Sequence, residues 1–162
     1  MSSQLKYALT VWQPWAALIV EGPKDVENRR KHPPRFLLGQ TIAIHAGKTF
    51  DDAAEAFARS IWPRGGHYPR LSTLEARGAI VGVATIADVC PPGQSCGDWH
   101  VPEQFGLMLA NRRALQTPVP CRGMPGYWLM PDDIRAVIEA AAQPQNAQQD
   151  SSTAKRIDST AP

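Results

Sequence analysis

A short charged motif follows residue 21: Gly22, Lys24, Glu27 and Arg29, in the pattern Gly-x-Lys-x-x-Glu-x-Arg. If this segment is extended, Glu27 and Arg29 project to the same side, because successive side chains of a strand alternate. Arg29 then offers a planar fork of donors, Lys24 a mobile positive charge, and Glu27 an acceptor for an exocyclic amine. These groups suit a phosphate and the edge of cytosine or adenine.

The same motif allows two other interpretations. In a catalytic one, a buried Lys24 acts as base or nucleophile while Glu27 orients water or moves a proton. In a structural one, the charges form an ion-pair network that ties the strand to the fold, as surface pairs often do. The motif by itself leaves all three interpretations open.

Three tryptophans are candidates for the walls of a site. An indole face stacks on any base, so Trp15 is a candidate stacking residue, although its position also suits a core residue. Trp128 is expected in the core. Trp99, in the loop GDWHVPEQ, is expected to form an exposed wall.

Basic residues cluster in two places although the net charge is only +2. One cluster covers residues 29–35 and the other residues 64–70, in a loop rich in glycine and proline. Both could contact phosphates, or they could be solvated surface.

Helix signals occur in four segments. Pro14 suits a first helical turn and Gly22 follows the end of the apolar run after it. Further helices are expected over 51–62, over 72–77, where Ser72 and Glu75 have the spacing of a capping box, and from Asp132 to about residue 142.

Five segments have the composition of strands: 40–46, 79–89, 105–109, 115–120 and 127–130. They are short, rich in β-branched or aromatic residues, and bounded by turn-forming residues. The expected fold is α+β, a small mixed β-barrel with flanking short helices.

The length of 162 residues suits one domain, which we place at residues 1–142. Residues 143–162 are expected to be a disordered tail, because they hold one large aliphatic residue among Gln, Ser, Thr and Ala. The first residues resemble neither a signal peptide nor a membrane span, so no membrane association and a cytoplasmic location are expected.

The three cysteines, Cys90, Cys96 and Cys121, are expected to be free thiols, because an odd number suits a reducing compartment. Together with His100 they invite a zinc interpretation. Their spacing matches no Cys-x-x-Cys knuckle, so no metal and no other cofactor is expected.

The segment LTVWQPWAALIVEGPKDVENR, followed by IAIHAGK, GAIVGVATIADV, FGLMLANRRALQTPVPCRG and GYWLMP, resembles the ASCH (activating signal cointegrator homology) domains in order and spacing. The likeness covers roughly residues 5 to 131. It implies a PUA-like β-barrel with the charged motif facing a cleft beside the first helix, and RNA or a nucleoside or nucleotide as the partner. The ligand-binding residues that it favours are Gln13, Trp15, Lys24, Glu27, Arg29, His45 and Lys48.

The resemblance leaves the activity open. Some bacterial members resemble an amidohydrolase acting on acetylated cytidine, and others have been associated with ribonuclease activity. Hydrolase-like members carry a threonine where this chain has Glu27, and their later catalytic glutamate has only Glu75 as a counterpart, by order alone. Binding of RNA or a modified nucleotide is therefore the leading hypothesis. The alternative is a metal-independent amidohydrolase or small ribonuclease with Lys24 and Glu27 as catalytic residues.

Overall fold

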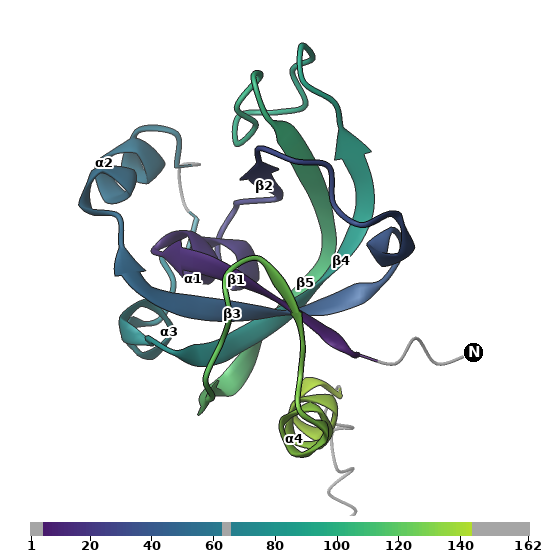
Figure 1. Cartoon of the computed structure of the whole chain (residues 1–162). Helices are drawn as coiled ribbons and strands as arrows, with labels where there is room; N and C mark the ends of the chain where they lie inside the picture. The colour runs from purple at the N-terminus through teal and green to yellow at the C-terminus, as the bar shows by residue number, and fades with distance from the viewer. Residues whose placement is uncertain (1–4, 63–65, 144–162) are drawn as a thin grey trace, which may run out of the picture.

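The computed structural model describes residues 5–62 and 66–143, which form six strands, four α-helices and one short 3-10 turn (Figure 1). In chain order these are β1 (Tyr7–Gln13), α1 (Trp15–Val20), β2 (Val26–Arg29), the 3-10 turn (Arg35–Leu37), β3 (Thr41–Phe50), α2 (Asp52–Ser60), α3 (Leu71–Glu75), β4 (Ala79–Cys90), β5 (Phe105–Pro120), β6 (Tyr127–Leu129) and α4 (Asp132–Ala142).

The strands form one mixed sheet in the order β2-β5-β4-β3-β1-β6. β1 and β3 are parallel, with Thr10 beside His45, and the other neighbours are antiparallel. The expected α+β class with flanking short helices is confirmed. The sheet is not closed, so the expected barrel is not confirmed: β2 and β6, of four and three residues, are its two edges.

Two features of the sheet differ from the sequence prediction. β1 was not among the predicted strands, although it lies between β3 and β6. The segments 105–109 and 115–120 are parts of one strand, β5. The polar run between them resembles a turn, and Asn111 does have a φ of 48°, but pairing with β4 resumes across a register shift between Ala110 and Arg113.

The helices begin and end close to where the sequence places them. Asp51 caps α2 by accepting a hydrogen bond from the Ala54 amide. The predicted capping box of α3 is wrong, because no side chain of its N-cap residue caps the helix. Instead Glu21, after α1, accepts hydrogen bonds from the Arg70 amide (2.6 Å) and the Thr73 hydroxyl (2.9 Å).

Three groups of buried apolar residues stabilise this arrangement. The largest packs α1 against the concave sheet, and the second lies between the sheet and α4, which sits at the bottom of Figure 1. The smallest comprises Leu18, Val26, Ala58 and Trp99, one residue each from α1, β2, α2 and the loop 91–104. That small group fixes the four segments that surround the charged motif relative to one another.

The loop 91–104 also changes the assignment of the cysteines. Cys90 and Cys96 form a disulfide and Cys121 is free, so the prediction of three free thiols is wrong for two of them. The loop folds back after β4 and brings the two Cα atoms to 6.3 Å, within the range that a disulfide spans.

The last predicted helix, α4, ends at Ala142, and the domain boundary expected at that residue stays a prediction. Of the predicted tail, residues 144–162 lie outside the described residues. Among the helices that the structure describes, none has the length and apolar character needed to cross a membrane.

Candidate functional site

The charged motif begins in a tight turn over the end of α1. The amides of Gly22 and Lys24 both donate to the Leu18 carbonyl, at 3.0 and 3.2 Å. A Cβ at position 22 would lie 2.8 Å from that carbonyl oxygen, so any side chain would push the turn off the helix. The glycine of the motif is therefore required by the close approach of two backbone segments.

Arg112 of β5 holds the same turn from the other side. Its Nη1 donates to the carbonyls of Ile19, Gly22 and Lys24 at 2.9 to 3.0 Å. Burial lowers the pKa of this guanidinium, while the nearby Asp25 acts in the opposite direction. Arg112 thus pairs carbonyls that the end of α1 leaves free, and it fixes the backbone of Lys24.

Glu27 lies between two cations. Its Oε2 is 3.0 Å from Lys24 Nζ and its Oε1 is 3.1 Å from Arg29 Nη2. The side chains of Lys24, Glu27 and Arg29 are 4%, 10% and 25% exposed. Lys24 also donates to the Val26 carbonyl, and its Nζ lies 5.6 Å from the centre of the Trp15 ring. The ion-pair network of the structural interpretation exists, but it is buried rather than on the surface.

Arg29 links the edge strand β2 to β1, which is the neighbour of the other edge strand, β6. It belongs to the edge strand β2, and its Nη2 donates to the Thr10 carbonyl of β1 at 2.9 Å. Tyr127, on the opposite edge strand β6, lies close enough to Glu27 and Arg29 for their charges to affect its pKa. Burial raises the pKa of Tyr127 to about 12, with Glu27 adding to the rise and Arg29 opposing it, so its hydroxyl remains a donor.

Two buried donors at this place are unpaired. Within residues 5–62 and 66–143, neither Arg29 Nε nor the Tyr127 hydroxyl has a hydrogen-bond partner. Leaving a buried polar group unpaired costs about 1–3 kcal/mol, and native structures contain few such groups. Both atoms belong to side chains that interact with the charge of Glu27, and both are buried in this conformation.

These residues line a cleft of about 960 Å³, here called the first cleft. Lys24 and Glu27 lie at its buried end, and Trp15, Trp99 and Tyr127 contribute to its walls. The exposed residues Arg30 and Lys31 line its outer part, and the carboxylates of Asp51 and Asp98 also border it. The first cleft therefore runs from a buried charged floor to a basic rim.

A second cleft, of about 990 Å³, adjoins the first and shares Thr10, Trp12 and Arg29 with it. It contains His45 and Lys48. Both ring nitrogens of His45 are occupied, by the Thr10 hydroxyl (3.2 Å) and the Cys121 carbonyl (3.1 Å). Burial lowers the pKa of His45, with the Cys121 carbonyl opposing it, so the ring is neutral near pH 7.

The structure thus divides the residues that the sequence grouped together. Trp15, Lys24, Glu27 and Arg29 meet in the first cleft, whereas His45 and Lys48 lie in the second. Gln13 is in the core: its amide donates to the carbonyls of Thr73 (2.7 Å) and Ala76 (3.1 Å) and accepts from the amide of Ala17 (3.1 Å). Gln13 holds α1 and α3 together and has no group left for a ligand.

The positions of the three tryptophans agree only in part with those expected from the sequence. Trp128 is buried, as expected. Trp99 borders the first cleft but is only 8% exposed, because it packs in the small core group, so its expected exposure is wrong. Trp15 is half-buried and makes edge contacts with Phe57 and Trp99, which leaves it a wall rather than an open stacking surface.

Two residues of the clefts were not singled out from the sequence. Trp12 is 56% exposed and borders both clefts. Its signal was available: in β1 it alternates with the buried Val11 and Gln13, so it lies on the opposite side of the strand, with Thr10. Tyr127 gave no such signal, since its position depends on the pairing of β6 with β1.

A sequence model of the ASCH domain matches residues 9–150. The chain belongs to the ASCH domain family. No curated protein shows significant sequence similarity to it. Crystal structures of an ASCH protein from Zymomonas mobilis share the fold of this ASCH domain. A serine-to-alanine variant superposes with a TM-score of 0.51 at 12% identity, covering 88% of this chain and 100% of that one. A tyrosine-to-phenylalanine variant gives 0.50 at 13% identity, covering 85% and 98%.

Proposed function

We propose that this ASCH domain binds RNA and seats one base in the first cleft. The observation that carries the proposal is the pair of unpaired donors, Arg29 Nε and the Tyr127 hydroxyl, beside the buried carboxylate of Glu27. Both residues border the cleft while the two donor atoms lie beneath its surface, so the proposal requires the two side chains to turn toward the ligand when it binds. Binding then removes the cost of leaving them unpaired.

The donors and the carboxylate together favour a particular base edge. Arg29 and Tyr127 can donate to two neighbouring acceptors, and Glu27 can accept from an exocyclic amine. The Watson–Crick edge of cytosine offers O2 and N3 as acceptors and N4 as donor, which matches all three groups. Adenine offers one acceptor and the amine on that edge, so cytosine is the preferred base.

The surroundings supply the two other contacts that single-stranded RNA needs. Trp12, exposed beside Arg29, is placed to stack on the seated base or its neighbour. The basic residues Arg30 and Lys31 at the rim can bind phosphates, and Lys48, Arg77 and Arg122 extend this basic surface along the second cleft.

Hydrolysis of a modified nucleoside is the second candidate, and it rests on the 3.0 Å contact between Lys24 and Glu27 at the floor of the cleft. We place it second because the Lys24 ammonium is shared among the Glu27 carboxylate, the Val26 carbonyl and the face of Trp15. In this arrangement Lys24 positions Glu27 rather than attacking a ligand.

The test is binding of labelled single-stranded oligomers of C, A and U, measured by fluorescence anisotropy at low salt. We expect the tightest binding for the C oligomer. Tyr127→Phe is expected to weaken it about tenfold, since a hydrogen bond is worth about 0.5–1.5 kcal/mol. The control is Tyr7→Phe, the same change on β1 at a residue that borders neither cleft.

A second arm separates binding from catalysis. The protein is incubated with a panel of plain and acylated nucleosides, and mass spectrometry records both retention and conversion. We expect retention without conversion. Conversion of an acylated cytidine that is lost in Lys24→Arg would establish the hydrolase instead, and equal RNA affinity of Tyr127→Phe and the wild type would contradict the placement of the base.

A further inference from the structure

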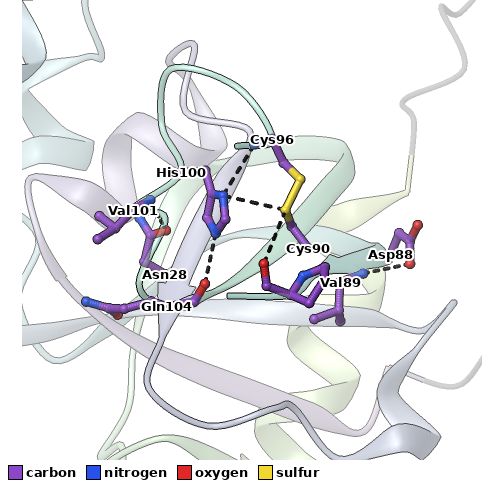
Figure 2. Close-up of a disulfide and its surroundings, with 9 residues drawn as sticks. Asn28, Asp88, Val89, Cys90, Cys96, His100, Val101 and Gln104 are labelled. Carbon is purple, nitrogen blue, oxygen red and sulfur yellow. Dashed lines mark hydrogen bonds between the residues drawn. A yellow bond between two sulfur atoms is a disulfide. The ribbon is translucent and has the colours of Figure 1, made fainter. Parts of the chain in front are cut away.

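Three potential metal ligands converge at the loop 91–104, and one of them, His100, also lines the first cleft. The sulfurs of Cys90 and Cys96 and a ring nitrogen of His100 all lie within 4.8 Å of one another. Cys90 is 3% exposed, His100 7%, and Cys96 is half-buried. The spacing in sequence gave no zinc motif, because the loop has to fold back before the three residues meet (Figure 2).

The hydrogen bonds of His100 fix which of its ring nitrogens can bind a metal. Its Nε2 lies 2.9 Å from the Gln104 carbonyl oxygen, which can only accept, so Nε2 carries the proton. Nδ1 is therefore the acceptor nitrogen: it accepts a hydrogen bond from the Cys96 amide at 3.3 Å and lies 3.5 Å from the Cys90 sulfur, so a metal would take the place of the amide proton (Figure 2). Metal-binding histidines are held in this way, with the second nitrogen donating to a carbonyl or carboxylate.

The backbone beneath the His100 imidazole leaves room for the ring. Gly106, at the start of β5, lies under the ring, and a Cβ there would be 2.6 Å from His100 Cδ2 and 2.8 Å from Val26 Cγ1. A side chain at position 106 would displace the ring from the sulfurs. The three ligands are thus held by the fold.

We propose that reduced Cys90 and Cys96, together with His100 Nδ1, bind one zinc ion, with solvent as the fourth ligand. Zinc favours thiolate and imidazole ligands in a tetrahedral arrangement, and two cysteines with one histidine are an established set of three. The metal and the disulfide exclude each other because both need the same two sulfurs.

The exchange between the two forms is balanced by ordinary thiol chemistry. A dithiol or phosphine reductant gives two electrons to the disulfide, which takes up two protons and becomes two thiols. A dithiol supplies these protons and becomes a disulfide, whereas a phosphine becomes a phosphine oxide with water as the source of its oxygen and of the two protons. Zinc then displaces the two thiol protons to solvent as the two sulfur–metal bonds form. A peroxide reverses the sequence by taking two electrons from the thiolates, forming water and releasing the metal.

The site is connected to the first cleft by Asn28. This residue, between Glu27 and Arg29 on β2, donates to the Trp99 carbonyl (2.9 Å) and accepts from the Val101 amide (2.8 Å). Trp99 adjoins His100 in sequence and borders the cleft. Exchange of disulfide for metal therefore acts on a segment that forms one cleft wall.

The test uses cobalt(II) as the spectroscopic probe on the full chain, reduced with a phosphine and kept free of oxygen. We expect one cobalt per chain, with the intense visible bands of a tetrahedral site, a thiolate charge-transfer band, and displacement by zinc. Cys90→Ser and Cys96→Ser should abolish these bands, and His100→Gln should weaken binding about tenfold or more. Cys121→Ser is the matched control and should change nothing, since burial raises the pKa of the Cys121 thiol.

Comparing the oxidised and reduced forms of the wild-type chain gives a test that does not depend on whether the variants fold. The oxidised protein has the same sequence and fold but both sulfurs are blocked, so it should give no cobalt–thiolate bands. The proposal is overturned if reduced protein gives no tetrahedral spectrum with equimolar cobalt. It is also overturned if oxidised protein, or Cys90→Ser, gives the same spectrum as reduced wild type.

Discussion

The two clefts of this ASCH domain are alike in size, at about 960 and 990 Å³, and share Trp12 and Arg29 as a common wall. They differ in how their buried polar groups are paired. In the second cleft both nitrogens of His45 have partners. Tyr127 and Glu27 line the first cleft only, and within residues 5–62 and 66–143 neither the Tyr127 hydroxyl nor Nε of the shared Arg29 has a hydrogen-bond partner. Volume and basic residues alone do not distinguish them. The unpaired groups do, because they leave free energy for a ligand to recover.

The largest effect is expected from Glu27→Gln. This change leaves the two cations of the motif without a countercharge, and removing one partner of a buried pair is strongly destabilising. We expect a loss of about 3 kcal/mol in the free energy of unfolding, the lower end of the range for buried pairs, because Arg29 is partly exposed. Urea denaturation measures it. Glu55→Gln, which breaks an exposed pair with Arg59, is the control and should show no resolvable change.

The next largest effect is expected from Trp12→Ala, which removes the exposed wall that the two clefts share. RNA affinity should fall by about 1–3 kcal/mol, the usual value of an aromatic stacking contact, while the melting temperature changes little. Phe36→Ala is the matched control, because Phe36 is 61% exposed and borders neither cleft. If both variants bind RNA alike, the shared wall is not where bases stack.

Exchanging basic residues should show which cleft the RNA backbone follows. Arg30→Ser with Lys31→Ser should reduce the slope of log affinity against log salt by about 1.4, since each phosphate contact on a single strand contributes about 0.7. Lys48→Ser with Arg122→Ser, in the second cleft, should change the slope less. A larger change from the second pair would reverse the assignment of the two clefts.

The smallest effect is expected from His45 in the second cleft, on the pH dependence of the stability of the domain. Its pKa in the folded chain lies below the ordinary 6.5. At pH values between the lowered pKa of the folded chain and 6.5, His45 is protonated in the unfolded chain but not in the folded one. The free energy of unfolding therefore falls as the pH decreases below about 6.5. His45→Gln should flatten the dependence of the melting temperature on pH below 7, and His67→Gln, at an exposed position, should not. An unchanged pH dependence in His45→Gln would show that the ring is not the group involved.

Part of the site follows from sequence alone because it is local. Glu27 and Arg29 share a side by strand alternation, and the glycine before Lys24 signals a tight turn, so their meeting was predictable. Trp12 was equally accessible by alternation. The core position of Gln13 could not be predicted, because its amide is paired with the carbonyls of Thr73 and Ala76, about sixty residues away.

The remaining differences also depend on contacts distant in sequence. Arg112 holds the motif from some ninety residues away, and nothing in its neighbourhood indicates its partners. Pairing with β4 carries β5 through a polar run that resembles a turn. The convergence of Cys90, Cys96 and His100 requires the fold of a loop whose composition suggests only irregular structure.

The open seam between β2 and β6 has a mechanical consequence. In a closed barrel, widening the mouth would break backbone ladder bonds between neighbouring strands. Here the edge strand β2 is joined across the first cleft to β1, the neighbour of β6, by the side chain of Arg29 bound to the Thr10 carbonyl. Separating β2 from β1 at the first cleft therefore breaks one side-chain hydrogen bond, while the backbone hydrogen bonds within the sheet remain. We therefore expect the width of the first cleft to vary. The same side chains could then accommodate either a base or a bulkier modified derivative of that base.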